Sequence, residues 1–275
     1  MRTTRINYVI VLVVCGLLSL CGCAETSDKP SPEAAKQFLK LRGYHFDEKS
    51  FFAAATASDV MAVNAFLAAG INPNGKDESR GETVMISAAS RGDTSIVKAL
   101  LEGGADVNAK GLGNSTALLR ALEKKQDDVA NILLAQQSLD LNAQGVNGAT
   151  ALIYYVSWDR EEIVAKLLER DANVNLQDVD GDTALHRAAQ NGNVDVVQML
   201  LRKGANPNIK NKVGGTPLMW AAVYGHDQAA TMLMANGADP RLKDEDGVTA
   251  SAWAAKNKQE DLAKLLREAE KGSRQ

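Results

Sequence analysis

The residues that could carry out chemistry are few and scattered along the chain. The three histidines, His45, His186 and His226, lack the spacing of a metal-binding set. The acidic segment 178–182 suggests a calcium loop, but its Gly181 comes too early and no glutamate closes the loop, so we interpret it as an acidic hairpin tip. No phosphate-binding glycine loop, zinc spacing or serine-elbow motif is present. The sequence therefore predicts no catalytic residue, no metal ligand and no cofactor, and it disfavours an enzyme.

The cysteines belong to an N-terminal segment with the layout of an export signal. All three, Cys15, Cys21 and Cys23, lie in the first 23 residues, so the rest of the chain has no pair to form a disulfide. Arg2 and Arg5 precede an apolar run at residues 8–20, as in a secretory signal. This run is shorter than the about 20 apolar residues of a membrane-spanning helix. We therefore predict a signal peptide over residues 1–22.

The end of this segment carries a more specific pattern. Leu20, Cys21, Gly22 and Cys23 resemble a bacterial lipobox, with an apolar residue at −3, a small residue at −1 and then a cysteine. The resemblance implies that Cys23 is acylated on its sulfur, freed by cleavage and acylated on its new amine. Two or three acyl chains suffice for stable anchoring. Ala24 stands where an inner-membrane retention signal would have Asp, which favours the periplasmic face of the outer membrane.

Other interpretations of the N-terminus stay open. The apolar run could remain uncleaved as an anchor, or the cysteines could simply fill a signal helix. Cys21 is a poorer lipidation site than Cys23, because Leu20 is too large for the −1 position.

Composition limits the remaining possibilities. The chain has 275 residues, 45% of them hydrophobic and 24% charged, which fits one extended or two compact folded domains. A net charge of −3 provides no basic field to attract nucleic acid. We predict a polar, lipid-anchored tether at residues 23–32, an N-terminal docking helix at 33–49, a repeat array at 50–268 and a C-terminal tail at 269–275.

The array is recognised by a repeat of about 33 residues. Equivalent threonines occur at Thr83, Thr116, Thr150, Thr183, Thr216 and Thr249, and Ser50 holds the equivalent place in the first unit. The spacing is 33 except for one step of 34 between Thr116 and Thr150, where an extra residue lies within residues 135–141. Each unit comprises a threonine, a helix of small residues, a turn, a leucine-rich helix and a polar loop. Such a period indicates stacked helical repeats.

The features that recur from unit to unit each have a physical role. The threonine hydroxyl can cap the first helix by accepting a backbone N–H. A pair of small residues such as Ala188 and Ala189 allows neighbouring helices to approach closely. Glycines such as Gly104, Gly204 and Gly237 end the second helix in a left-handed conformation. One unit cannot bury both helices, so the units must stack on each other.

The segment 183–208, TALHRAAQNGNVDVVQMLLRKGANPN, resembles an ankyrin repeat. The resemblance implies an all-α, ankyrin-type solenoid of about seven helix-turn-helix repeats with short β-hairpin loops. It also implies that His186 holds its turn by hydrogen bonds, and that a concave face formed by the first helices binds another protein. The units that begin at Thr116 and Thr150 depart from the pattern, since larger residues replace the alanine pair there. Polar Asn64 and Arg267 indicate capping units at the ends.

A stripe on the first helices is the predicted partner-binding surface. Positions four, seven and eight after each threonine share one helical face, and all three tryptophans fall on them. Tryptophan, tyrosine and arginine dominate the energetics of protein interfaces. The predicted contact residues are Tyr154, Trp158, Arg187, Trp220, Tyr224 and Trp253. The alternative, which we prefer for Tyr155, is that such aromatic side chains fill gaps between repeats.

These features together favour a protein-protein interaction module tethered to the cell envelope as a lipoprotein. We expect a protein partner and a lipid-anchored membrane association, without nucleic acid or a small-molecule substrate. The alternative is a structural or stress-protective envelope protein with no dedicated ligand. Burial of the aromatic stripe between repeats would favour that alternative.

Overall fold

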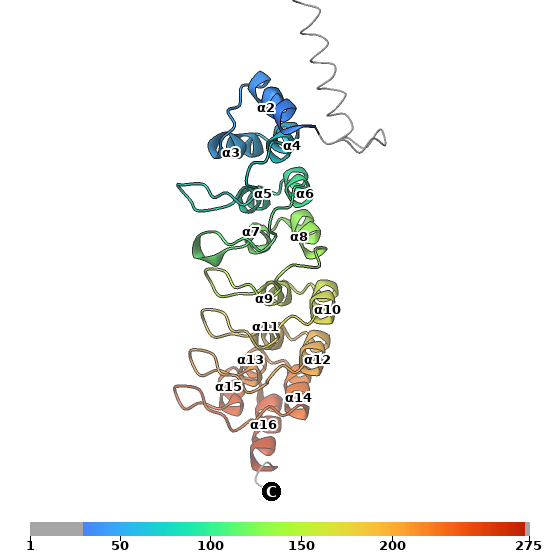
Figure 1. Cartoon of the computed structure of the whole chain (residues 1–275). Helices are drawn as coiled ribbons and strands as arrows, with labels where there is room; N and C mark the ends of the chain where they lie inside the picture. The colour runs from blue at the N-terminus through green and yellow to red at the C-terminus, as the bar shows by residue number, and fades with distance from the viewer. Residues whose placement is uncertain (1–29, 273–275) are drawn as a thin grey trace, which may run out of the picture. The chain divides into compact units, whose positions relative to one another are not determined.

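The structure, a computed structural model, describes residues 30–272. The predicted signal peptide, Cys23 and nearly all of the tether lie outside these residues. Within them the chain forms fifteen α-helices and one short 3-10 turn, η2 (Leu112–Asn114), and no strand (Figure 1). The loops contain only isolated β-bridges, Lys76–Thr83 and Lys243–Thr249. The prediction of an all-α fold is confirmed, and no helix in the described range is long and apolar enough to cross a membrane.

The chain divides into two compact units between Leu139 and Asp140. The division falls within the segment that contains the extra residue of the irregular repeat. Unit 1 contains α2 (Pro32–Leu41), α3 (Glu48–Thr56), α4 (Val60–Ala68), α5 (Val84–Arg91), α6 (Thr94–Glu102), α7 (Ala117–Glu123) and α8 (Asp127–Leu134). Unit 2 contains α9 (Ala151–Ser157), α10 (Glu161–Glu169), α11 (Ala184–Asn191), α12 (Val194–Arg202), α13 (Pro217–Tyr224), α14 (Asp227–Ala235), α15 (Ala250–Lys256) and α16 (Glu260–Gly272).

In unit 2 the helices pack in two rows. The first helices of successive repeats contact one another in the order α9, α11, α13 and α15, and α10, α12 and α14 form the second row (Figure 1). Close approach is possible because the alanine pairs, such as Ala188–Ala189 and Ala221–Ala222, are fully buried. In the enlarged repeat, Tyr155 and Val156 are buried at the equivalent positions. Tyr155 is therefore a core residue, as expected of a side chain that fills a gap.

Threonine caps start most of the first helices. The hydroxyls of Thr83, Thr116, Thr150, Thr183 and Thr216 each accept a hydrogen bond from the backbone N–H three residues later. This satisfies a donor that the helix itself cannot pair. Thr249 is the exception, because its hydroxyl lies 3.1 Å from the Ser251 hydroxyl and makes no cap.

Ser50 does not start its helix, contrary to its equivalence with the threonines. α3 begins at Glu48, and Asp47 is the N-cap, since its carboxylate accepts from the Ser50 N–H at 2.7 Å. The first helix of the first repeat, α3, thus begins earlier than the repeat pattern predicts, because Asp47 stands in a place from which it can cap.

The N-terminal end of unit 1 is covered by α2. Phe38 and Leu39 of α2 are buried, and the helix packs against α4. Phe66 of α4 is fully buried and contacts the rings of Phe46 and Phe51. In the range 33–49, where we predicted a docking helix, the chain therefore forms α2, a connecting loop and the start of α3.

The loop tips of unit 2 are joined by backbone hydrogen bonds. The N–H groups of Val179, Lys212 and Glu245 donate to the carbonyl oxygens of Asn147, Asp180 and Val213, at 2.9, 2.9 and 3.1 Å. Each bond links one repeat to the next. Glycines with positive φ permit this approach: a Cβ on Gly181, whose φ is +81°, would lie 2.8 Å from the Lys212 nitrogen. The tips are thus held at a fixed spacing beside the first helices.

Candidate functional site

The predicted contact residues of unit 2 share one position on successive first helices. Tyr154, Arg187, Trp220 and Trp253 each lie four residues after the threonine that begins the repeat, and each is partly exposed. The residues on either side of them along each helix are mostly buried, so these four side chains lie on the helix face that points away from the core. Because the first helices pack in sequence, these four side chains form a row along unit 2.

Tyr154 and Trp158 form an aromatic pair on α9 and at its C-terminal end. Their ring centroids are 5.5 Å apart, and the Tyr155 ring meets Trp158 edge-on at 5.8 Å. The Asn147 amide donates to the Tyr154 hydroxyl at 2.9 Å. Trp158 therefore rests on the buried Tyr155 while remaining partly exposed.

Arg187 directs its guanidinium to the acidic loop tip. Its Nη2 lies 2.9 Å from Asp178 Oδ2 and 3.1 Å from Asp182 Oδ2, and both carboxylates are nearly buried. Asp178 also accepts from the backbone N–H groups of Asp180 and Asp182. Two of the three carboxylates of the acidic tip are thus paired with an arginine of its own chain. Within residues 30–272 no cluster of histidine, cysteine or carboxylate side chains could hold a metal ion.

Trp220 and Tyr224 are stacked on α13. Their centroids are 6.1 Å apart, and the Tyr224 hydroxyl accepts from Gln190 Nε2 at 3.1 Å. The His226 ring also stacks with Tyr224, and its Nε2 lies 3.0 Å from the Gln190 carbonyl oxygen. Tyr224 is 48% exposed. The repeat at α11 thus fixes the orientation of this aromatic pair on α13.

Trp253 is held by an aspartate of its own loop. Its Nε1–H donates to Asp244 Oδ2 at 2.7 Å, and the Lys256 ammonium lies 4.6 Å from the ring centroid. Asp244 and Trp253 are nine residues apart, as are Asp178 and Arg187, so the two repeats use the same geometry with different donors. Asp244 was not among the residues that we predicted. This shared spacing of nine was the signal that could have identified it.

His186 holds the turn that begins α11, as the resemblance implied. The Thr183 N–H donates to its Nδ1 at 3.1 Å, which places the ring proton on Nε2, 3.2 Å from the Gly215 carbonyl. Burial lowers the pKa of the His186 imidazole below its ordinary value, and the Asp182 carboxylate offsets part of this effect. The ring stays neutral and links two repeats, which is a structural role.

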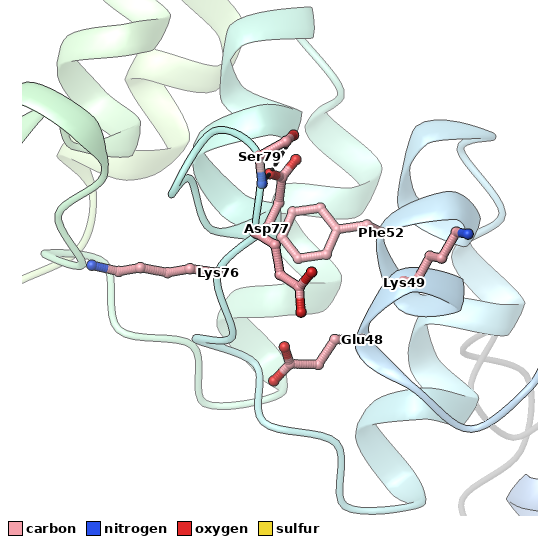
Figure 2. A pocket seen from close by; sticks show the side chains of 7 residues that line it. Glu48, Lys49, Phe52, Lys76, Asp77 and Ser79 are labelled. Atoms are coloured by element: carbon pink, nitrogen blue, oxygen red, sulfur yellow. Dashed lines mark hydrogen bonds between the residues drawn. The ribbon is translucent and has the colours of Figure 1, made fainter.

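Unit 1 has a separate hollow that the sequence did not predict. It has a volume of about 470 Å³ and lies between α3 and the loop that precedes α5. Figure 2 shows the Phe52 ring facing this loop, with Lys49 and Lys76 directed away to opposite sides. The Asp77 carboxylate accepts hydrogen bonds from the Arg80 N–H and from the hydroxyl and N–H of Ser79, which lower the pKa of Asp77. These hydrogen bonds of Asp77 are all made within its own loop.

Comparison with known proteins agrees with this geometry. The family described as ankyrin repeats (3 copies) matches this chain over residues 51–144, 133–211 and 203–275. The crystal structure of an ankyrin repeat domain from Acinetobacter baumannii AYE is 28% identical, with a TM-score of 0.59, over 67% of this chain and 96% of that one. The ankyrin repeat domain of Bcl-3, described as a unique member of the IkappaB protein family, is 28% identical, with a TM-score of 0.62, over 79% of this chain and 97% of that one. No protein of curated function matches the chain.

Proposed function

From the premise that the chain belongs to the ankyrin repeat family, we propose that it binds a protein partner through the aromatic row of unit 2 while tethered to the cell envelope by a lipid. Ankyrin repeats are protein-protein interaction modules, and their fold is typically a binding scaffold without enzymatic activity. The partner contacts that we assign are Tyr154, Trp158, Arg187, Trp220, Tyr224 and Trp253.

The partial exposure of the aromatic side chains carries this proposal. Trp158, Trp220 and Trp253 are neither buried in the core nor free in solvent, and Tyr224 is about half exposed. Each is also oriented by a contact within the chain, such as the Trp253–Asp244 hydrogen bond. Side chains that are large, pre-oriented and partly exposed lose little entropy on binding, which is the chemistry of interface hot spots. A purely structural protein would need these rings buried between repeats.

The test of partner binding is capture from intact cells. We expect chemical crosslinking followed by mass spectrometry to identify a protein that the wild-type chain retains and that a Trp220→Ala/Trp253→Ala variant loses. The matched control is Leu112→Ala/Val146→Ala, because both residues are highly exposed and apolar but lie outside the row. Equal recovery by the tryptophan variant, with an unchanged melting curve, would contradict the proposal.

The membrane anchor is a separate proposal that rests on the lipobox resemblance at residues 20–23. Metabolic labelling with a fatty acid tests it. We expect the wild-type chain and Cys21→Ala to carry label and Cys23→Ala to lose it. Loss of label in Cys21→Ala alone would move the site to that cysteine, and label in none of the three would reject lipidation. Membrane fractionation of the labelled wild type then tests the expected outer-membrane location.

A further inference from the structure

A slot opens between the two tryptophans of the last two repeats. Trp220 and Trp253 line it together with Val213, Met219, Val223 and Asp244. Its volume is about 230 Å³, and its lining is almost entirely apolar apart from the aspartate. Gly215 completes the lining, and all seven residues belong to unit 2. Because Val213 is 60% exposed and lies at a loop tip, the slot reaches the outer rim of the row.

The size of the slot limits what can occupy it. Sites for drug-sized molecules and cofactors are typically about 300–1,000 Å³, and this slot is smaller. It has room for one bulky side chain, and its lining favours an apolar one. The two indole walls differ: Trp253 is fixed by its bond to Asp244, whereas Trp220 Nε1 is buried with no acceptor. Asn211, at the place of Asp244 in its own repeat, donates instead to Asp182. Trp220 is thus the wall whose indole N–H has no acceptor within the described residues.

Three consecutive carboxylates, Asp244, Glu245 and Asp246, lie at the rim of the slot, next to Lys243 in the sequence, and Asp244 lacks the internal cation found two repeats earlier. Asp178 is paired with Arg187, but the equivalent Asp244 has no ion-pair partner within the described contacts. Its oxygens accept only from Trp253 and from the backbone N–H groups of Asp246 and Val248. Glu245 and Asp246 are exposed beside it. The Lys256 ammonium lies over the Trp253 ring rather than at these carboxylates.

We propose that this slot accepts a bulky apolar side chain, such as leucine, from a segment of a partner protein in which lysine or arginine flanks that residue. The apolar side chain lies between the two indoles, and the flanking cations face Asp244, Glu245 and Asp246. This inference rests on the proposed function and specifies the chemistry of the partner. A small apolar molecule or a second copy of the chain are the alternatives to be tested.

The test uses synthetic peptides and the indole N–H signals of the full-length, ¹⁵N-labelled chain. The probe is Gly-Lys-Lys-Leu-Lys-Lys-Gly, compared with versions that carry alanine for leucine or glutamate for lysine. We expect the first peptide to shift the signals of Trp220 and Trp253 and to leave Trp158 unchanged. Replacing leucine by alanine is expected to weaken binding about tenfold or more, because less apolar surface is buried. The glutamate peptide is expected not to bind.

A matched pair of variants locates the binding. Val213→Lys places an ammonium at the slot, whereas Val179→Lys makes the same change at another exposed tip. We expect the first to abolish the shifts and the second to preserve them. Equal binding of the leucine and alanine peptides, unchanged binding by Val213→Lys, binding of isobutanol as tight as that of the leucine peptide, or shifts that follow protein concentration without peptide would each overturn the inference. If cellular capture depends on Trp220 and Trp253 while the peptide fails, this inference alone is wrong.

Discussion

Unit 1 and unit 2 place different side chains at the same exposed positions of their first helices. In unit 1 these positions, four, seven and eight residues after the threonine, carry serines and charged residues. Both arginines are used internally: Arg120 pairs with Glu82 at 2.6 Å and with Glu123 at 3.0 Å, and Arg91 donates to the Ala55 carbonyl. In unit 2 five of the twelve positions carry aromatic rings, which are those of Tyr154, Trp158, Trp220, Tyr224 and Trp253. Threonine caps and buried alanine pairs occur in both units. The repeat thus fixes the scaffold, while the side chains of this stripe differ between the two units.

The largest expected effect is a difference in stability between substitutions at a loop tip of unit 2 and at a loop tip of unit 1. We predict that Gly181→Ala lowers the free energy of unfolding by about 2–4 kcal/mol, because positive φ and the 2.8 Å approach to Lys212 both oppose a Cβ. Gly81→Ala in unit 1 is the control, since its φ is +61° but nothing lies within 4 Å of the added atom. It is expected to cost about 1 kcal/mol. Urea denaturation measures both, and equal losses would show that tip contact contributes nothing.

A smaller effect is expected at the buried ion pair of unit 2. Arg187→Ala removes the cation from Asp178 and Asp182, whose side chains are 7% and 6% exposed, and should cost about 1–3 kcal/mol. Lys203→Ala breaks an exposed pair with Asp171 and should cost under about 0.5 kcal/mol. Thermal unfolding of both variants makes the comparison. An unchanged stability of Arg187→Ala would mean that the internal ion pair contributes nothing and that Arg187 is available to contact a partner.

The pH dependence of unit 2 should depend on His186, because unit 1 has apolar residues such as Ile86 at the equivalent position. The folded-state pKa of His186 is lowered by burial, so the unfolded chain binds the proton more readily. Stability is therefore complete above the unfolded pKa near about 6.5 and falls as the pH drops below it. We predict that His186→Gln loses less stability between pH 7.5 and 5.5 than the wild type. A loss equal to that of the wild type would assign the pH effect to other groups.

The smallest expected effect concerns a feature that the units share. Thr116→Ala removes the cap of α7 and should cost about 1 kcal/mol. Thr249→Ala removes a hydroxyl that caps nothing, so it should cost less. Circular dichroism during urea unfolding compares the two. An equal cost would mean that the threonine acts through burial and not through its cap.

The sequence was sufficient for the fold because its determinants are local and repeated. The caps, the alanine pairs and the glycines after the second helices recur at a constant spacing, and Gly104, Gly204 and Gly237 do have positive φ. Ser50 was misplaced because Asp47 offered a competing cap. The ion pair of Arg187 and the slot beside Trp220 could not be predicted, since they depend on how side chains of a loop and a neighbouring repeat meet. Tip hydrogen bonds likewise involve backbone atoms that carry no sequence signature.

Those tip hydrogen bonds have a consequence for exchange of amide hydrogens with solvent. Val179, Lys212 and Glu245 lie on loops, where rapid exchange would be the default for an unpaired N–H, yet each donates to a carbonyl of the preceding repeat. Deuterium can enter only when two adjacent repeats separate at that point. These three amides are therefore expected to exchange as slowly as the amides of the surrounding helices. Together their exchange rates report the opening of each junction between repeats in unit 2.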